Sequence, residues 1–387
     1  MRPARAWGDS TLTGLADSRP LQILAVYGTR PEAIKMAPVI SALRRRPDRF
    51  ALTVVTTGQH RELLEPVQEL FGLRPDLDLR LMTPDQTLNG LAASSLAALD
   101  EVLRDRRPDW LLVQGDTTTA MSAALAAFHR GVRVGHVEAG LRTGDLTQPF
   151  PEEANRRIID LLAAALFAPT ERAGRALLAE GRERSQVHVV GNTVIDALRS
   201  LDFAAPESPE RPEVLITVHR RESFGSPLRG IFSALRRLAE SFPEVVWKYP
   251  VHRNPNVSGP AVEQLSGLPN LELCEPLGYR ELMVLLARCR FVLTDSGGLQ
   301  EEAPAFGKPV LVLRETTERP EGIEAGVARL VGTDPERIVA EASRLLTSPE
   351  AWLEMARAVN PYGDGQAASR IAAMLAGEAW TAFQAGG

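Results

Sequence analysis

From Leu21 onward, short apolar runs alternate with longer segments in which apolar residues recur at helical spacing. In the first half of the chain, the apolar runs predict strands at residues 22–26, 52–56, 110–113, 132–137, 166–168 and 187–190. Amphipathic patterns between them predict helices at residues 34–45, 61–71, 88–106 and 119–129. Strands that alternate with helices in this order favour a parallel sheet covered by helices.

A segment of linker composition interrupts this alternation at residues 202–212, where Pro206, Pro209 and Pro212 stand among few apolar residues. The pattern then begins again, with strands predicted at 214–218, 245–249, 271–273, 291–294 and 310–313 and helices at 227–242, 280–287 and 299–306. We therefore expect two α/β domains, residues 21–200 and 213–365, joined by a linker at 201–212, with a cleft between them. A last helical stretch, about residues 366–387, could pack back on the first domain or on the second.

The composition is that of a globular protein with a mild negative charge. The chain has 387 residues, of which 44% are hydrophobic, and a formal net charge of -5. Its length favours two domains, and its acidity argues against nucleic acid as a partner, because proteins that track phosphates usually have a basic face. The two cysteines, Cys274 and Cys289, form neither a disulfide framework nor a zinc-binding spacing, which fits a reducing cytoplasm.

No apolar run reaches the roughly 18 residues needed to cross a bilayer, so we expect no membrane association. Residues 1–20 contain Arg2, Arg5 and Asp9 without an apolar core after them, and this pattern is not that of a signal peptide. We expect residues 1–20 to form a disordered extension.

The segment that follows the predicted strand 132–137 is rich in charged residues and glycine. It contains Glu138, Arg142, Glu152 and Arg156 and ends at the next apolar run, 158–167. Loops that leave buried strands carry much of the chemistry of α/β proteins, so this composition indicates an active site. The alternative for each single carboxylate is a solvated surface position.

Two other predicted strands of the first domain also end in polar residues. Arg30 and Lys35 lie at and just beyond a helix start marked by Pro31, and Asp116 follows the strand 110–113. Ligands of open α/β sheets bind beside the carboxyl ends of strands, so these side chains are candidates for the same site. The alternatives are a solvated helix end for the cations and, after the strand 110–113, a helix N-cap by Asp116 or Thr117.

In the second domain, Asp295-Ser296-Gly297-Gly298 stands between an apolar strand and a helical pattern. Free backbone N–H groups and the helix dipole favour an anion there, and glycine lets the ligand come close. The alternative for Ser296 is an ordinary N-cap, and Glu302 is either a hydrogen-bond acceptor for ribose hydroxyls or a surface carboxylate.

Histidines follow two strands of the second domain. His219 stands in the run HRRE and His252 in the run PVHRNP, so each lies beside an arginine. Imidazole serves readily in proton transfer and phosphate contact near neutral pH. Neither G-x-G-x-x-G after a strand nor G-x-x-x-x-G-K-[ST] occurs in the chain, so nicotinamide-dependent hydride transfer is unsupported.

These segments together resemble the bacterial UDP-N-acetylglucosamine 2-epimerases of the non-hydrolysing type, from about Leu21 to the end of the chain. The matching motifs are GTRPEAIK at 28–35, TGQHR at 57–61, GDTT at 115–118, HVEAGLRT at 136–143, PEE at 151–153, HRRE at 219–222 and DSGGLQEE at 295–302. The resemblance implies a glycosyltransferase-B-like fold of two Rossmann-like domains with parallel sheets facing a central cleft.

It also implies the interconversion of UDP-GlcNAc and UDP-ManNAc, by elimination of UDP to 2-acetamidoglucal and re-addition. The catalytic residues that the resemblance implies are Asp116, Glu138, Glu152 and His219. The substrate- and UDP-binding residues that it implies are Arg30, Lys35, Arg142, Arg156, Ser296, Gly297, Gly298 and Glu302. The reaction needs no metal and no redox cofactor, so none is expected.

A second UDP-GlcNAc site that activates the enzyme is implied at Gln59, His60 and His252, and the family also implies a cytoplasmic homodimer. Several alternatives stay open: a hydrolysing epimerase that releases ManNAc and UDP, a 2-epimerase for a UDP-linked diacetamido sugar, a glycosyltransferase of the same fold, and an inactive UDP-sugar-binding protein. The last of these would be expected to lack one of the implied catalytic residues, and all are present.

Overall fold

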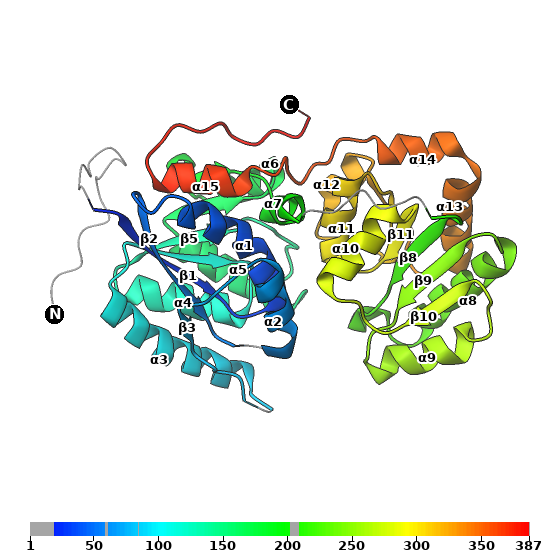
Figure 1. Cartoon of the computed structure of the whole chain (residues 1–387), viewed down its shortest axis with the longest axis horizontal. Coiled ribbons are helices and arrows are strands. Elements are labelled where there is room, and N and C mark those ends of the chain that lie inside the picture. Colours follow the sequence, from blue (N-terminus) through cyan, green and yellow to red (C-terminus); the bar gives the residue numbers. More distant parts are fainter. Residues whose placement is uncertain (1–18, 59–60, 84, 202–208, 387) are drawn as a thin grey trace. The chain divides into compact units, whose positions relative to one another are not determined.

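The computed structural model describes residues 19–58, 61–83, 85–201 and 209–386. The chain falls into two compact units, of which the first comprises Met1–Leu201 with Gly363–Ala385 and the second Asp202–Tyr362 (Figure 1). The expected N-terminal extension, except for residues 19 and 20, and most of the expected linker lie outside the described residues. Each unit is built around one parallel sheet.

The first unit contains a seven-stranded parallel sheet in the order β3-β2-β1-β4-β5-β6-β7. Its strands are β1 (Leu21–Tyr27), β2 (Phe50–Thr56), β3 (Leu77–Asp78), β4 (Trp110–Gln114), β5 (Arg133–Val137), β6 (Ala165–Ala168) and β7 (Val187–Val189). Its helices are α1 (Arg30–Arg44), α2 (Arg61–Leu70), α3 (Leu88–Arg106), α4 (Thr118–His129), α5 (Glu152–Leu162), α6 (Glu171–Ala179), α7 (Thr193–Ser200) and α15 (Ala367–Leu375), with a 3₁₀ turn η1 at Arg184–Gln186.

Strand order reverses between β1 and β4. β1 pairs with β2 on one side and with β4 on the other, although the segment 50–106 separates β1 from β4 in the chain. All five residues of β4 are buried, as expected for a parallel strand that is covered on both faces. The loops after β1 and β4 diverge at this reversal, which is where open α/β sheets bind ligands.

The second unit contains a six-stranded parallel sheet in the order β10-β9-β8-β11-β12-β13. Its strands are β8 (Glu213–Thr217), β9 (Val246–Pro250), β10 (Leu271–Cys274), β11 (Phe291–Thr294), β12 (Val310–Val312) and β13 (Ala328–Leu330). Its helices are α8 (Ser226–Ser241), α9 (Pro255–Leu265), α10 (Tyr279–Arg288), α11 (Gly297–Glu302), α12 (Pro320–Glu324), α13 (Pro335–Thr347) and α14 (Pro349–Ala356), with 3₁₀ turns η2 (Arg221–Ser223) and η3 (Ala303–Phe306). Strand order reverses between β8 and β11, so the loops that carry His219 and Ser296 begin side by side.

The predicted C-terminal helix at about residues 366–387 is wrong in its extent, because α15 ends at Leu375. Gly377 follows with a φ of +69°, and its N–H donates to the carbonyl of Met374 at 3.0 Å. The chain then runs on without helix, and the N–H of Phe383 donates to the carbonyl of Val189 in β7 at 2.9 Å. α15 itself packs on α1 and α7 of the first unit (Figure 1).

The helix predicted at 299–306 also differs, since α11 ends at Glu302 and the chain continues as the 3₁₀ turn η3. Pro304 accounts for the change, because it has no N–H to donate to a preceding carbonyl. Within the part of the chain that the structure describes, none of the helices has the length and apolar character needed to span a bilayer.

Candidate active site

The buried carboxylate of Glu32 joins the loop after β1 to the loop after β4. It accepts hydrogen bonds from the N–H groups of Gly28 (2.8 Å) and Thr29 (2.6 Å) and from the hydroxyl of Thr117 (2.6 Å). Burial raises the pKa of Glu32, and the hydrogen bonds act in the opposite direction. The start of α1, where Arg30 is exposed, is thereby attached to the loop that carries the predicted catalytic Asp116.

Lys35 and Glu138 form a buried ion pair. The distance from Lys35 Nζ to Glu138 Oε1 is 2.5 Å, and the side chains are 11% and 7% exposed. Gln114, at the end of β4, donates its amide N–H to the other carboxylate oxygen. Glu138 has a φ of +71°, a left-handed conformation that costs a non-glycine residue about 1 kcal/mol or more and that concentrates at functional sites.

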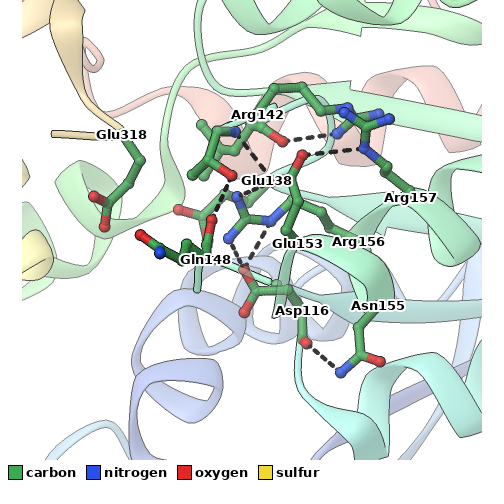
Figure 2. A network of polar contacts seen from close by, with 12 residues as sticks. Asp116, Glu138, Arg142, Gln148, Glu153, Asn155, Arg156, Arg157 and Glu318 are labelled. Carbon is green, nitrogen blue, oxygen red and sulfur yellow. Dashed lines mark hydrogen bonds and ion pairs between the residues drawn. The ribbon is translucent and has the colours of Figure 1, made fainter. Parts of the chain in front are cut away.

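Asp116 is held by two residues of α5 (Figure 2). Arg156 Nη2 and Nε lie 2.6 and 3.1 Å from Asp116 Oδ2, and Asn155 donates to the backbone carbonyl of Asp116 at 2.9 Å. The side chain that caps α4 is that of Thr117, which accepts from the N–H of Ala120 at 3.0 Å, so the N-cap alternative is confirmed for Thr117 and not for Asp116. The carboxylate of Asp116 is therefore oriented by α5 and remains 27% exposed.

Glu153 anchors this network from the first turn of α5 and is fully buried. It accepts from Arg156 at 3.0 Å and Arg157 at 3.0 Å, and also from the N–H groups of Thr143 (3.1 Å) and Gly144 (3.4 Å) (Figure 2). The loop after β5, the start of α5 and Asp116 are thus linked through one carboxylate. The neighbouring Glu152, a predicted catalytic residue, is only partly buried.

His136 lies fully buried behind the turn that precedes Asp116. Its Nδ1 is 2.6 Å from Asp160 Oδ1, and its Nε2 is 2.8 Å from the carbonyl oxygen of Gly115. A carbonyl oxygen only accepts, so the Nε2–H group of His136 donates to Gly115. Burial alone would raise the pKa of Asp160, but His136 and Arg142 outweigh it and hold that pKa below its usual range.

Arg142, a predicted substrate-binding residue, lies in ion pairs within the first unit. Its Nη2 is 2.8 Å from Asp160 Oδ2 and 2.6 Å from Glu180 Oε2. Burial would lower the pKa of Arg142, but the two carboxylates raise it overall. In this arrangement Arg142 holds the loop after β5 against α5 and the end of α6.

In the second unit, the buried carboxylate of Asp295 shapes the turn that carries His219. Its Oδ2 accepts from the N–H groups of His219 and Arg220, each at 2.8 Å, and its Oδ1 is 3.3 Å from His219 Nδ1. The ring of His252 stacks on that of His219, with 5.7 Å between centroids and 18° between planes. The other two residues of the predicted second site, Gln59 and His60, lie outside the described residues.

The DSGG turn enters α11 directly after β11. Ser296 is the N-cap residue, but its side chain makes no capping hydrogen bond. A Cβ on Gly297 would lie 2.7 Å from Arg319 Nη1, so only glycine permits this guanidinium to approach. Glu302 is 7% exposed and accepts from the hydroxyl of Tyr279 at 3.0 Å.

The structure therefore places two ion pairs, Lys35 with Glu138 and Arg156 with Asp116, at the carboxyl ends of β1, β4 and β5. In the second unit, His219 and the DSGG turn follow the neighbouring strands β8 and β11. Among the described residues, no group of His, Cys, Asp and Glu side chains is arranged to hold a metal ion.

Sequence reasoning missed Gln114, His136, Glu153 and Arg319. The spacing of Glu153 to Arg156 and Arg157 is i,i+3 and i,i+4, a helical ion-pair pattern that can be read from the sequence. His136 stands two residues before Glu138, in the strand that leads to it, and belongs to the motif at 136–143, but the sequence pattern predicted no role for it. Arg319 gives no local signal, since it reaches Gly297 only through the tertiary fold.

Comparisons with known proteins agree in their result. The sequence profile of a family described as UDP-N-acetylglucosamine 2-epimerase matches residues 41–376. A UDP-N-acetylglucosamine 2-epimerase from Yersinia pestis is 48% identical over 366 residues, which are 91% of this chain and 97% of that protein. A crystal structure of UDP-GlcNAc 2-epimerase from Neisseria meningitidis bound to UDP-GlcNAc is 43% identical, with a TM-score of 0.85, and the match covers 92% of this chain and 99% of that one.

A structure of the glycotransferase of kitacinnamycin is similar in fold alone. It is 15% identical, has a TM-score of 0.64, and the match covers 92% of this chain and 100% of that one. Together with the two parallel sheets, these likenesses confirm the predicted glycosyltransferase-B-like fold class.

Proposed function

The chain belongs to the UDP-N-acetylglucosamine 2-epimerase family, and we propose that it interconverts UDP-GlcNAc and UDP-ManNAc without releasing the sugar. The observation that carries this proposal is the polar network of the first unit, in which Lys35 and Arg156 orient the carboxylates of Glu138 and Asp116. A reaction that moves a proton on and off a sugar carbon needs such positioned carboxylates.

The chemistry proceeds by elimination and re-addition. The hydrogen at C2 has no neighbouring carbonyl to acidify it, because C1 is an acetal carbon that bears UDP. A carboxylate removes the C2 proton while the bond from C1 to the diphosphate oxygen breaks, and its electron pair leaves with UDP. The C1–C2 double bond of 2-acetamidoglucal forms. Return of UDP to C1 and delivery of a proton to the opposite face of C2 complete the epimerisation.

We assign the proton transfers to Asp116, Glu138 and Glu152. Asp116 and Glu138 follow neighbouring parallel strands, and Glu152 begins the helix whose next turn holds Asp116. Arg30, Lys35, Arg142 and Arg156 are the proposed cations of the first unit for the sugar or diphosphate. Arg142 and Arg156 would act chiefly by orienting the carboxylates they contact.

We assign the UDP group to the second unit. Ser296 would contact the phosphate through its hydroxyl, because its N–H donates to Thr294 Oγ1 at 2.9 Å, and Gly297 and Gly298 would contact it through their N–H groups. His219 would act in catalysis or contact phosphate, and Glu302 would accept from the ribose. Departing UDP is an anion, so donors of this kind stabilise it and keep it for its return. Retention of UDP is what separates this reaction from hydrolysis.

A second UDP-GlcNAc site at Gln59, His60 and His252 remains part of the proposal, supported in the structure by the stacking of His252 on His219. A cytoplasmic location fits the two free cysteines.

We also propose a homodimer. Ile158 and Leu161 on α5 are 39% and 62% exposed, and we propose that the dimer interface covers these apolar side chains. Light scattering that reported a monomer would contradict the dimer.

The test is incubation of the purified chain with UDP-GlcNAc in D₂O, with the C1 and C2 protons followed by NMR. UDP-ManNAc that carries deuterium at C2 is the expected product. Free ManNAc with UDP would show a hydrolysing enzyme instead. An unchanged spectrum would contradict the proposed substrate and would direct the search to UDP-linked diacetamido sugars.

A further inference from the structure

Three arginine side chains of the second unit converge on one carboxylate, that of Glu318, which lies between β12 and α12. Arg319 Nη1 and Arg220 Nη2 are 2.7 and 3.4 Å from Glu318 Oε1, and Arg314 Nη1 is 2.7 Å from Oε2. Arg220 comes from the loop after β8, whereas Arg314 and Arg319 follow β12. Glu318 therefore joins two loops at the carboxyl ends of the strands.

The carboxylate is 9% exposed, so solvent screens these contacts little. Burial alone would raise the pKa of Glu318, but Arg319, Arg314 and Arg220 outweigh it and hold that pKa well below its usual range. Glu318 is thus ionised, and each of its contacts with these arginines is charge-assisted.

Arg319 is held on two edges of its guanidinium. Nη1 contacts Glu318, and Nε donates to Glu301 Oε1 at 2.7 Å. Because a guanidinium is planar and rigid, two carboxylates on different edges set its orientation. In that orientation the group lies against Gly297, where a Cβ would be 2.7 Å from Nη1 and 2.9 Å from Cζ.

We infer that Glu318 is a positioning residue for UDP binding, because it sets the guanidinium of Arg319 against the first residue of α11. The inference rests on the proposed function, in which the DSGG turn holds the diphosphate. Glu318 itself contacts no substrate in this account. It fixes the side chain of Arg319 before an anion binds. Binding therefore costs less side-chain entropy, which is the effect of preorganisation.

The direction in which the Kd for UDP changes separates a positioning role of Glu318 from a purely electrostatic effect of its charge. A carboxylate near an anion site repels the anion, so its neutralisation alone would tighten UDP binding. Loss of a positioning carboxylate weakens UDP binding instead. We expect Glu318→Gln to raise the Kd for UDP roughly 10- to 100-fold, the range for lost charge-assisted hydrogen bonds, as measured by isothermal titration calorimetry on the full chain.

Glu222→Gln is the matched control. Glu222 contacts Arg314 at 2.6 Å in the same cluster and is 52% exposed, so its loss removes an equal charge and leaves both carboxylate contacts of Arg319 in place. We expect the control to keep the Kd for UDP within about twofold of the wild type or to lower it.

Glu318→Asp keeps the charge but shortens the side chain, and it too is expected to weaken binding, since the contact with Arg319 is lost. With UDP-GlcNAc, both Glu318 variants should raise KM much more than they change kcat. Equal or tighter UDP binding by Glu318→Gln and Glu318→Asp would overturn the inference. A wild-type chain that binds no UDP would overturn the proposed function, and this inference with it.

Discussion

Because Lys35 and Glu138 form a buried ion pair, we expect substitutions of the two residues to have strongly coupled effects on the free energy of unfolding. This coupling can be measured separately from catalysis. The atoms are 2.5 Å apart, and both side chains are almost fully buried. At an effective dielectric constant of about 20 their attraction is roughly 7 kcal/mol, from which the loss of hydration of both groups subtracts. Removal of one partner leaves the other charge buried, which typically costs about 3–5 kcal/mol.

We therefore expect Lys35→Met and Glu138→Gln each to lower the free energy of unfolding of the first unit by about 3–5 kcal/mol, a large part of a typical total of about 5–15 kcal/mol. The double variant removes both charges and should lose no more than either single variant. The coupling energy should thus be at least about 3 kcal/mol. Urea unfolding can be followed by pulsed hydrogen exchange in peptides that cover β4 and β5. These peptides report the free energy of unfolding of the first unit alone, and the coupling energy is calculated from it.

Measurements of activity separate the stabilising role of this ion pair from the catalytic role assigned to Glu138. Glu138→Gln is expected to reduce turnover about 10²- to 10⁴-fold, and the double variant should stay as inactive although it is no less stable than either single variant. Stability losses of the single variants that add up in the double variant would refute the ion-pair reasoning. Recovery of turnover in the double variant would refute the catalytic assignment of Glu138.

Asp116→Asn is expected to lower epimerisation about 10²- to 10⁴-fold, measured by NMR in D₂O, and a wild-type rate would remove Asp116 from the proton-transfer scheme. Ser296→Ala should weaken UDP binding in calorimetry more than it slows deuterium exchange at C2 in saturating substrate; an unchanged affinity would argue against the DSGG turn as phosphate site. Burial raises the pKa of Asp196 to about 6, so the folded protein favours the protonated carboxyl group. The stabilisation from this proton is present at low pH and is lost as pH rises through about 6. Asp196→Asn has no proton to lose and keeps an acceptor for the N–H of Ala368. Between about pH 4 and about pH 8, its free energy of unfolding in urea should therefore rise by about 3 kcal/mol relative to that of the wild type. A difference between the two proteins that does not change with pH would contradict this.

The regular elements were predictable where periodicity was strong and local. The predicted helix at 88–106 coincides with α3, and the strand predicted at 22–26 lies within β1. β3, with two residues, is too short for a period-2 pattern to show. The end of α15 depends on Gly377 and on the pairing of Phe383 with β7, and the second of these is a tertiary contact.

The amino-acid sequence by itself determined the two α/β units, the strand ends that carry polar residues and the motifs of the family, since each depends on neighbours within a few turns of chain. Only the tertiary structure decided which charges meet: Lys35 and Glu138 are 103 residues apart, and Asp116 and Arg156 are 40 apart. Pairs at such separations form because parallel strands bring their loops to one edge of the sheet. Local patterns cannot encode which partner each loop will meet there, so Arg142 turned toward Asp160 and Glu180, and His136 toward Gly115, without any signal in the sequence beside them.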